Sequence, residues 1–278
     1  MSDIINGAKV TFGCEFKFMR VSYVTPAIVL RSWPLGESDK IVSFLTEGHG
    51  KLTGIAKGAK RSKKRFVNCL EPFSFVSLNF QDRSHTSLAF ILGCELQKSY
   101  KKLISSLEKI TFASYCVEIT DGLIAEREEN RLVFDHLKKS LRYLESEEPS
   151  VTFLIGFELK LLSLAGYQPF LDSCRHCGMY RHDLYEPVQM GQARWYFSFR
   201  DGGILCAGCS KLRKEIMPIS GETLNLMVNL QQEPNSIFET LNPSATVLKQ
   251  VRSAMVRFIQ FQLDREIKSA SFLDQFCS

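Results

Sequence analysis

Four of the nine cysteines stand in two close pairs, and this pairing is the first sign of chemistry in the chain. Cys174 and Cys177 form "CRHCG", and Cys206 and Cys209 form "CAGC", with two residues inside each pair. A C-x-x-C turn points both thiolates at one tetrahedral ion, and Zn²⁺ accepts four thiolates at about 2.3 Å. The sequence therefore predicts one structural zinc ion per chain, bound by all four sulfurs.

The residues between the two pairs favour this interpretation, because "RWYFSF" (194–199), the turn "RDGG" (200–203) and "ILC" read as a hairpin that returns the second pair to the first. Two unrelated packing pairs are the alternative. A redox C-x-x-C occurs singly at a helix start, and a catalytic zinc keeps one coordination position open, so both fit less well. His176 and His182 are expected at the surface, outside the ligand set.

The other five cysteines are scattered singly, and we interpret them as small core residues with free thiols. The N-terminus has no signal-peptide pattern, and no apolar run approaches the roughly 18–20 residues of a membrane span. A cytoplasmic protein is therefore expected, in which thiols stay reduced.

A second stretch, "KLTGIAKGAKRSKKRF" at 51–66, carries seven Lys and Arg and no acidic residue. Residues 1–100 hold 14 basic against 8 acidic residues, whereas residues 101–278 hold 21 against 22. Such asymmetry indicates an anionic partner for the N-terminal part. With one arginine from the preceding strand, the candidate nucleic-acid-binding residues are Arg31, Lys51, Lys57, Lys60, Arg61, Lys63, Lys64 and Arg65.

A solvated loop is the ordinary explanation of a basic run, but two local features favour a binding surface. Glycine has no side chain and so allows a ligand to approach the backbone closely, and this region contains Gly48, Gly50, Gly54 and Gly58. Four aromatic residues lie close by in the sequence, namely Phe44, Phe66, Phe73 and Phe75. Their rings would stack on bases if they are exposed rather than in the core. Phosphate contacts would dominate, so binding is expected to depend steeply on salt and little on sequence.

No catalytic constellation stands out. "GIAKGAK" fails the spacing of a phosphate-binding P-loop, and there is no G-x-G-x-x-G after a strand, no G-x-S-x-G and no H-E-x-x-H. We therefore expect a binding protein rather than an enzyme.

The elements that position these residues change character along the chain. Short stretches rich in Val, Ile, Phe and Thr predict five strands, at 25–33, 40–47, 50–59, 73–80 and 86–96. Five such strands fit a small OB-type barrel, with an SH3-like barrel as the rival. The basic run falls in a loop or strand end at the barrel rim.

After Gln97 the apolar spacing becomes helical and predicts helices at 104–129, 130–146, 151–167, 220–232 and 243–264. The third is apolar nearly all round and is expected at the centre, with Gly166 ending it. Ser244 is the expected N-cap of the last. The fold class is thus α+β, divided into an N-terminal segment 1–22, the barrel 23–98, helical parts 99–171 and 212–278, and the zinc insertion 172–211.

The whole layout resembles the RecO family of bacterial recombination mediators. The barrel stretches "AIVLRSWPLGESDKIVSFLTEGHGKLTGIAKGAKRSKKRF" and "LEPFSFVSLNF" carry the likeness in the N-terminal part. "FELKLLSLAGYQPFLDSCRHCG" and "FSFRDGGILCAGC" carry it in the helical part with its zinc insertion. Residues 1–22 depart from the family pattern, as either a short extension or a start drawn too far upstream.

The resemblance implies a protein that binds single- and double-stranded DNA, anneals complementary strands without a nucleotide, and acts with RecR to load RecA onto strands coated by single-strand-binding protein. The family's contact with the acidic tail of single-strand-binding protein would map to the helical domain, and the protein would be nucleoid-associated in the cytoplasm. The rival hypotheses are a zinc-stabilised RNA-binding OB-fold module and an enzyme with an unrecognised site.

Overall fold

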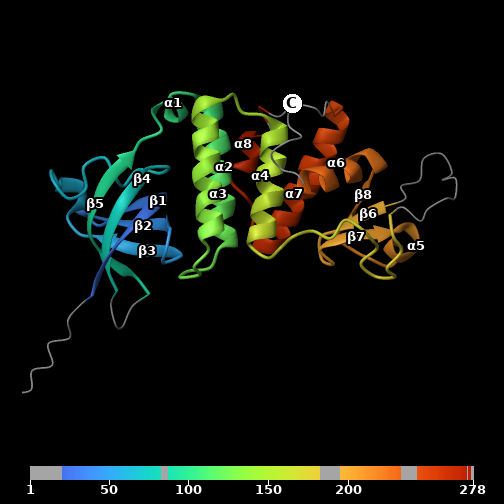
Figure 1. Cartoon of the computed structure of the whole chain (residues 1–278), viewed down its shortest axis with the longest axis horizontal. Helices are drawn as coiled ribbons and strands as arrows, with labels where there is room; N and C mark the ends of the chain where they lie inside the picture. Colours follow the sequence, from blue (N-terminus) through green and yellow to red (C-terminus); the bar gives the residue numbers. More distant parts are fainter. Residues whose placement is uncertain (1–20, 83–86, 182–194, 233–242, 274, 277–278) are drawn as a thin grey trace, which may run out of the picture.

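The computed structural model describes residues 21–82, 87–181, 195–232, 243–273 and 275–276. A barrel, a group of helices and a small three-stranded sheet follow one another along its long axis (Figure 1). In the described ranges, no helix has the length and apolar character to cross a membrane. Of the predicted segment 1–22, residues 1–20 lie outside the described residues.

The barrel confirms the predicted OB-type fold. Its strands close in the order β1-β2-β3-β5-β4, with β3 parallel to β5 and the other neighbours antiparallel. The strands are β1 Ser22–Leu35, β2 Asp39–Thr46, β3 Lys51–Ala56, β4 Phe75–Gln81 and β5 Ala89–Lys98.

Alternation along the strands fills the barrel with apolar side chains. In β4, the alternate residues Val76, Leu78 and Phe80, which share one face, are buried. The opposite face of β1 and β2 packs on the helices, because Ile28, Leu30 and Leu45 belong to the helical core cluster rather than the barrel cluster. The barrel is therefore fixed to the helical part through apolar contacts.

The helical part contains α1 Lys101–Ile104, α2 Leu107–Leu123, α3 Arg131–Ser146, α4 Val151–Leu164, α6 Gly221–Gln232, α7 Ala245–Leu263 and α8 Ala270–Leu273. Ser244 caps α7 by accepting a hydrogen bond from the Val247 N–H, as predicted. The first predicted helix, 104–129, extends too far, because Ile124 is extended and Glu126 forms a parallel bridge with Lys51 of the barrel.

The cysteine-bearing segment forms a three-stranded sheet with β6 Trp195–Ser198 between β7 Gly203–Cys206 and β8 Ile216–Ile219. The predicted hairpin is β6–β7, and Gly202 in its turn has a φ of 66°. The strand β8 lies beyond the expected boundary at residue 211. Apolar side chains of this sheet, including Phe197 and Leu205, join the helical core cluster.

A buried ionic group links three helices. Glu158 of α4 accepts hydrogen bonds from the Tyr115 hydroxyl of α2 and from the Arg252 guanidinium of α7. Tyr115 and Glu158 have no exposed surface, and Arg252 is 7% exposed. Burial raises the pKa of Glu158, and the charge of Arg252 opposes that rise.

Replacing Arg252 with leucine is expected to lower the free energy of unfolding by about 3–5 kcal/mol, because it leaves a buried carboxylate without its cation. Replacing Glu158 with leucine as well should recover most of the loss, since no buried charge remains. Urea unfolding of the two variants measures the difference. A double variant no more stable than Arg252→Leu would contradict this account.

Candidate nucleic-acid interface and metal centre

The predicted basic loop is a compact turn that follows β3, and we call residues 57–65 the basic turn. Gly58 adopts a left-handed conformation with a φ of 67°, and a 3-10 turn covers Ala59–Arg61. The Gly58 N–H donates to Asp39 Oδ1 at 2.8 Å. The backbone N–H of Lys60 donates to the Ser38 carbonyl at 2.9 Å, and its Nζ donates to the Gly36 carbonyl at 2.7 Å. These bonds hold the basic turn against the turn between β1 and β2.

The far end of the basic turn is anchored in the barrel. Arg65 donates from its guanidinium to the Lys57 carbonyl at 2.9 Å, and its own carbonyl accepts from the Cys94 N–H of β5 at 3.0 Å. The next side chain, Phe66, is 5% exposed and belongs to the barrel core. Hydrogen bonds therefore fix the basic turn at both ends, and Ala59 packs against the barrel core between them, whereas residues 60–65 are all polar or charged.

The charges of the basic turn face solvent. Its six cationic side chains are all exposed, and they are Lys57, Lys60, Arg61, Lys63, Lys64 and Arg65. In the part of the chain that the structure describes, none of the six lies in an ion pair with a carboxylate, and the side chains of Arg61, Lys63 and Lys64 hold no hydrogen bond. The hydrogen bonds from Gly58 and Ser38 lower the pKa of Asp39, and Lys57 and Lys60 add to the effect.

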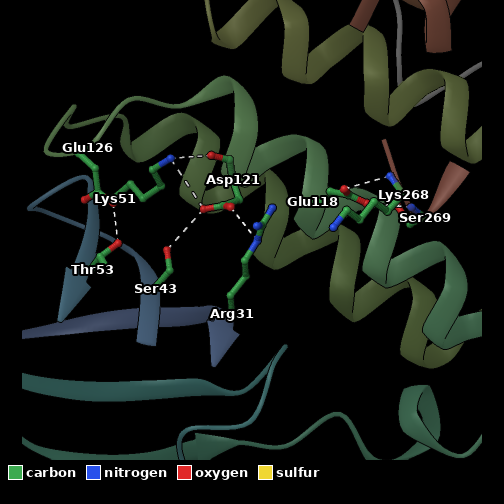
Figure 2. A network of polar contacts seen from close by, with 9 residues as sticks. All are labelled: Arg31, Ser43, Lys51, Thr53, Glu118, Asp121, Glu126, Lys268 and Ser269. Atoms are coloured by element: carbon green, nitrogen blue, oxygen red, sulfur yellow. Dashed lines mark hydrogen bonds and ion pairs between the residues drawn. The ribbon is translucent and has the colours of Figure 1, made fainter. Parts of the chain in front are cut away.

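Arg31 and Lys51 lie elsewhere, at the contact between the barrel and α2. Arg31 Nε is 2.8 Å from Asp121 Oδ2, and Lys51 Nζ donates to the Asp121 carbonyl at 2.5 Å. Ser43 donates to the same carboxylate, and Thr53 donates to Glu126 (Figure 2). The side chain of Lys51 is only 13% exposed and that of Arg31 is 40% exposed, and both are paired with Asp121, unlike the cations of the basic turn.

The glycines and aromatic rings of this region serve the fold. A Cβ on Gly50 would lie 2.3 Å from the Glu128 carbonyl oxygen, and one on Gly54 would lie 2.4 Å from Ile91 inside the barrel. The expected stacking rings Phe44 and Phe66 are buried, and Phe73 and Phe75 pack against the helical core. Sequence reasoning missed Trp33 of β1, which is 39% exposed.

The four paired cysteines come together as predicted. Their sulfur atoms all lie within 4.8 Å of one another, and the Sγ atoms of Cys177 and Cys206 are 3.8 Å apart. A tetrahedral site with metal–sulfur bonds of about 2.3 Å requires sulfurs about 3.8 Å apart, so the donor set fits a single ion.

The backbone around the cluster prepares it for a cation. The Cys206 N–H donates to Cys174 Sγ at 3.4 Å, and Gly178, with a φ of 76°, closes the first turn by donating to the Cys174 carbonyl. Burial raises the pKa of Cys174, but N–H bonds from Cys177, Cys206 and His176 outweigh it and bring the value to about 7. Burial and the neighbouring thiols raise the pKa of Cys209 to about 12. Crowded sulfurs of this kind ionise together only around a positive ion.

A pocket of about 580 Å³ opens between α3 and α4. Its floor is aromatic, with Phe153 and Phe157, and the side chains of Tyr143 and Phe153 stack at 4.6 Å between ring centroids. Lys139 and Lys160 also line it. Asp135 lines it as well, so the pocket combines an aromatic floor with two cations and one carboxylate.

His136 packs against the floor of this pocket, with its ring stacked on Phe157 and its Nε2 3.1 Å from the Phe157 carbonyl oxygen. Burial lowers the pKa of His136 to about 4, the hydrogen bond to Phe157 opposes this, and Lys160 and Lys139 add to it. The neutral ring therefore donates its Nε2–H to the carbonyl.

The stability that neutral His136 contributes is expected to be fully present above about pH 6.5 and lost as the pH falls toward about 4. The reason is that the unfolded chain takes up the proton first, since an unperturbed histidine has a pKa of about 6.5. His136→Phe should therefore show a smaller fall in unfolding free energy between about pH 7 and about pH 5, measured by urea titration. Equal slopes in both proteins would contradict this prediction.

Comparisons with known proteins agree with this architecture. The family model "Recombination protein O N terminal" matches residues 19–100, and "Recombination protein O C terminal" matches residues 104–271. The chain is 31% identical over 258 residues to the DNA repair protein RecO of Syntrophus aciditrophicus (strain SB), covering 92% of this chain and 96% of that protein. RecO of Caldanaerobacter subterraneus subsp. tengcongensis is 32% identical over 250 residues, covering 89% and 96%. With both family models matched and these relatives aligned over nearly their full length, the chain belongs to the RecO family of DNA repair proteins.

Proposed function

We propose that this protein binds DNA through the basic turn, anneals complementary single strands without a nucleotide, and acts with RecR to load RecA onto strands covered by single-strand-binding protein. The observation that carries the proposal is the basic turn itself. Six exposed cations lie at one rim of an OB barrel, and none of them forms an ion pair with a carboxylate of the described residues. Phosphates of a nucleic acid supply such ion-pair partners.

Annealing needs no reaction centre. Two complementary strands repel each other through their phosphates, and a surface that neutralises both lowers that repulsion and raises the local concentration of strands. The basic turn fits this task because the N–H groups of Gly58 and Lys60 fix its backbone to Asp39 and to the β1–β2 turn, so its cations are already gathered before the strands arrive.

The cysteine cluster supports a structural role for the metal. We assign the ion as zinc, because four sulfur ligands at these separations are the donor set of closed zinc sites. When bound, zinc supplies folding energy and no chemistry here, since four thiolates leave no coordination position for a substrate. The chain's own contribution is to orient the sulfurs through β7 and the two C-x-x-C turns.

The helical domain offers a site for the acidic tail of single-strand-binding protein in the pocket between α3 and α4. An aromatic floor accepts an apolar residue, and Lys139 and Lys160 attract neighbouring carboxylates. This assignment rests on the two lysines beside the aromatic floor, and Asp135 is the carboxylate that also lines the pocket.

The decisive experiment is an annealing assay with purified protein and complementary DNA strands, without ATP, with and without single-strand-binding protein. We expect faster duplex formation in both conditions, and a further increase in RecA loading when RecR is present. A matched pair of RNA strands tests the rival function. Annealing of RNA but not DNA would favour an RNA-binding module, and no annealing of either would overturn the proposal.

A further inference from the structure

The outer face of the β1–β2–β3 sheet is divided into a covered part and an open part. Strand register aligns Arg31, Ser43 and Thr53 in one row across the three strands. The α2 helix and the segment after it cover this row, through Asp121 and Glu126 (Figure 2). Ligands of OB barrels bind on this kind of face, so the covered row is closed to them.

The next row on the same face is open. Positions two residues further along each strand lie on the same side of a sheet, and the register aligns Trp33 with Ile41 and Ile55. The residues between the two rows point inward, since Val42 belongs to the barrel core. Trp33 and Leu35 of β1 are each 39% exposed, so an apolar strip faces solvent here.

This apolar strip borders the basic turn. Leu35 is followed directly by the β1–β2 turn, where the Gly36 and Ser38 carbonyls hold Lys60. Directly after the third strand, Lys57 comes two residues beyond Ile55. An exposed indole thus stands beside a group of exposed cations, where sequence reasoning expected the buried rings of Phe44 and Phe66.

We propose that Trp33 is a stacking platform for an unpaired base of single-stranded DNA, whose phosphates lie on the basic turn. This inference rests on the proposed function and adds a preference to it. A flat aromatic face stacks any base, but the faces of bases inside a duplex are covered by their neighbours. The basic turn attracts both kinds of DNA, and Trp33 favours the single strand.

Tryptophan fluorescence tests the proposal directly, because the chain has two tryptophans and the other, Trp195, is 4% exposed. Titration with an oligothymidylate is expected to quench the emission of the Trp195→Phe variant, in which Trp33 alone emits. The Trp33→Phe variant should show no quenching, although its binding, followed by the anisotropy of a labelled oligonucleotide, persists. A duplex of the same length should bind without quenching Trp33.

Affinities give a second readout. Trp33→Ala is expected to weaken single-strand binding about tenfold and to leave duplex binding within about twofold, because stacking on an aromatic ring contributes about 1–3 kcal/mol per base. Trp33→Phe, which keeps an aromatic face, should stay within about threefold of the parent. The matched control is Phe272→Ala, which removes a 61% exposed ring from α8 and should change neither affinity.

The outcomes separate this inference from the proposed function. Binding of oligothymidylate without quenching of Trp33, or equal weakening of single-strand and duplex binding by Trp33→Ala, would overturn the platform and leave DNA binding by the basic turn intact. The apolar strip would then be assigned to a protein partner. Failure of the parent protein to bind either DNA would overturn both.

Discussion

Replacing Arg61, Lys63 and Lys64 together with alanine is expected to weaken binding to single-stranded DNA by about 100-fold at about 0.1 M salt. Each phosphate contact on a single strand contributes about 0.7 to the slope of log affinity against log salt concentration, so three contacts contribute about 2. The loss of affinity should therefore shrink as salt rises, and the slope should fall by about 2. Anisotropy titrations over a range of salt concentrations measure both quantities.

These three residues are chosen because their side chains take no part in holding the basic turn, whereas Lys60 and Arg65 donate to backbone carbonyls. The variant should therefore unfold at the same temperature as the parent. A control with the same change in charge is Lys101, Lys102 and Lys249 replaced by alanine, all three being exposed on the helical part. If both triple variants lose affinity equally, the basic turn is no special site and net charge alone attracts DNA.

Replacing Cys206 with serine is expected to abolish tight zinc binding and to unfold the sheet β6–β8. Cys206 ends β7, so the substitution removes the sulfur that joins this strand to the other three cysteines of the cluster. Structural zinc sites supply on the order of 10 kcal/mol of apparent binding energy to the segments they fold. Metal analysis should find one zinc per chain in the parent and a substoichiometric amount in the variant.

Trp195 reports the structural consequence. It lies at the start of β6 with 4% exposure, so unfolding of the sheet should shift its emission to longer wavelength, best seen in a Trp33→Phe background. The helical part should lose stability too, because Phe197, Ile204 and Leu205 pack in its core cluster. Cys94→Ser is the matched control, since this thiol lies in the barrel and its loss should leave the zinc content unchanged. A metal-free parent that keeps the short-wavelength emission of Trp195 would disprove the structural role.

Local patterns were sufficient for the barrel strands, for most of the long helices and for the clustering of the four paired cysteines. Alternation in "FSFVSLNF" indicates a strand with Val76, Leu78 and Phe80 on one face, and the structure shows that this is the buried face. The Ser244 cap of α7 depends on one serine and the N–H three residues later. Two C-x-x-C turns constrain four sulfurs so closely that their clustering follows once the hairpin between them forms.

Contacts between residues far apart in the chain could not be predicted from such local patterns. Arg31 and Lys51 belong to the same basic excess as the basic turn, yet both contact Asp121, which is 90 and 70 residues away in the chain. The first predicted helix ends early for a similar reason, since Glu126 pairs with Lys51 across the contact between the two parts. Neither partner carries a local signal of the other.

The sequence by itself thus determined the barrel, most of the long helices, the cysteine cluster and the position of the basic turn, because each depends on neighbours within a strand, a helical turn or a hairpin. Tertiary structure alone decided which face of the barrel is covered by α2, which cations remain free for a ligand, and that Trp33 is exposed while Phe44 is buried. The physical reason is that exposure and ion pairing depend on which surfaces pack together. Packing joins residues that are far apart in the chain, and no local sequence pattern indicates which of them will meet.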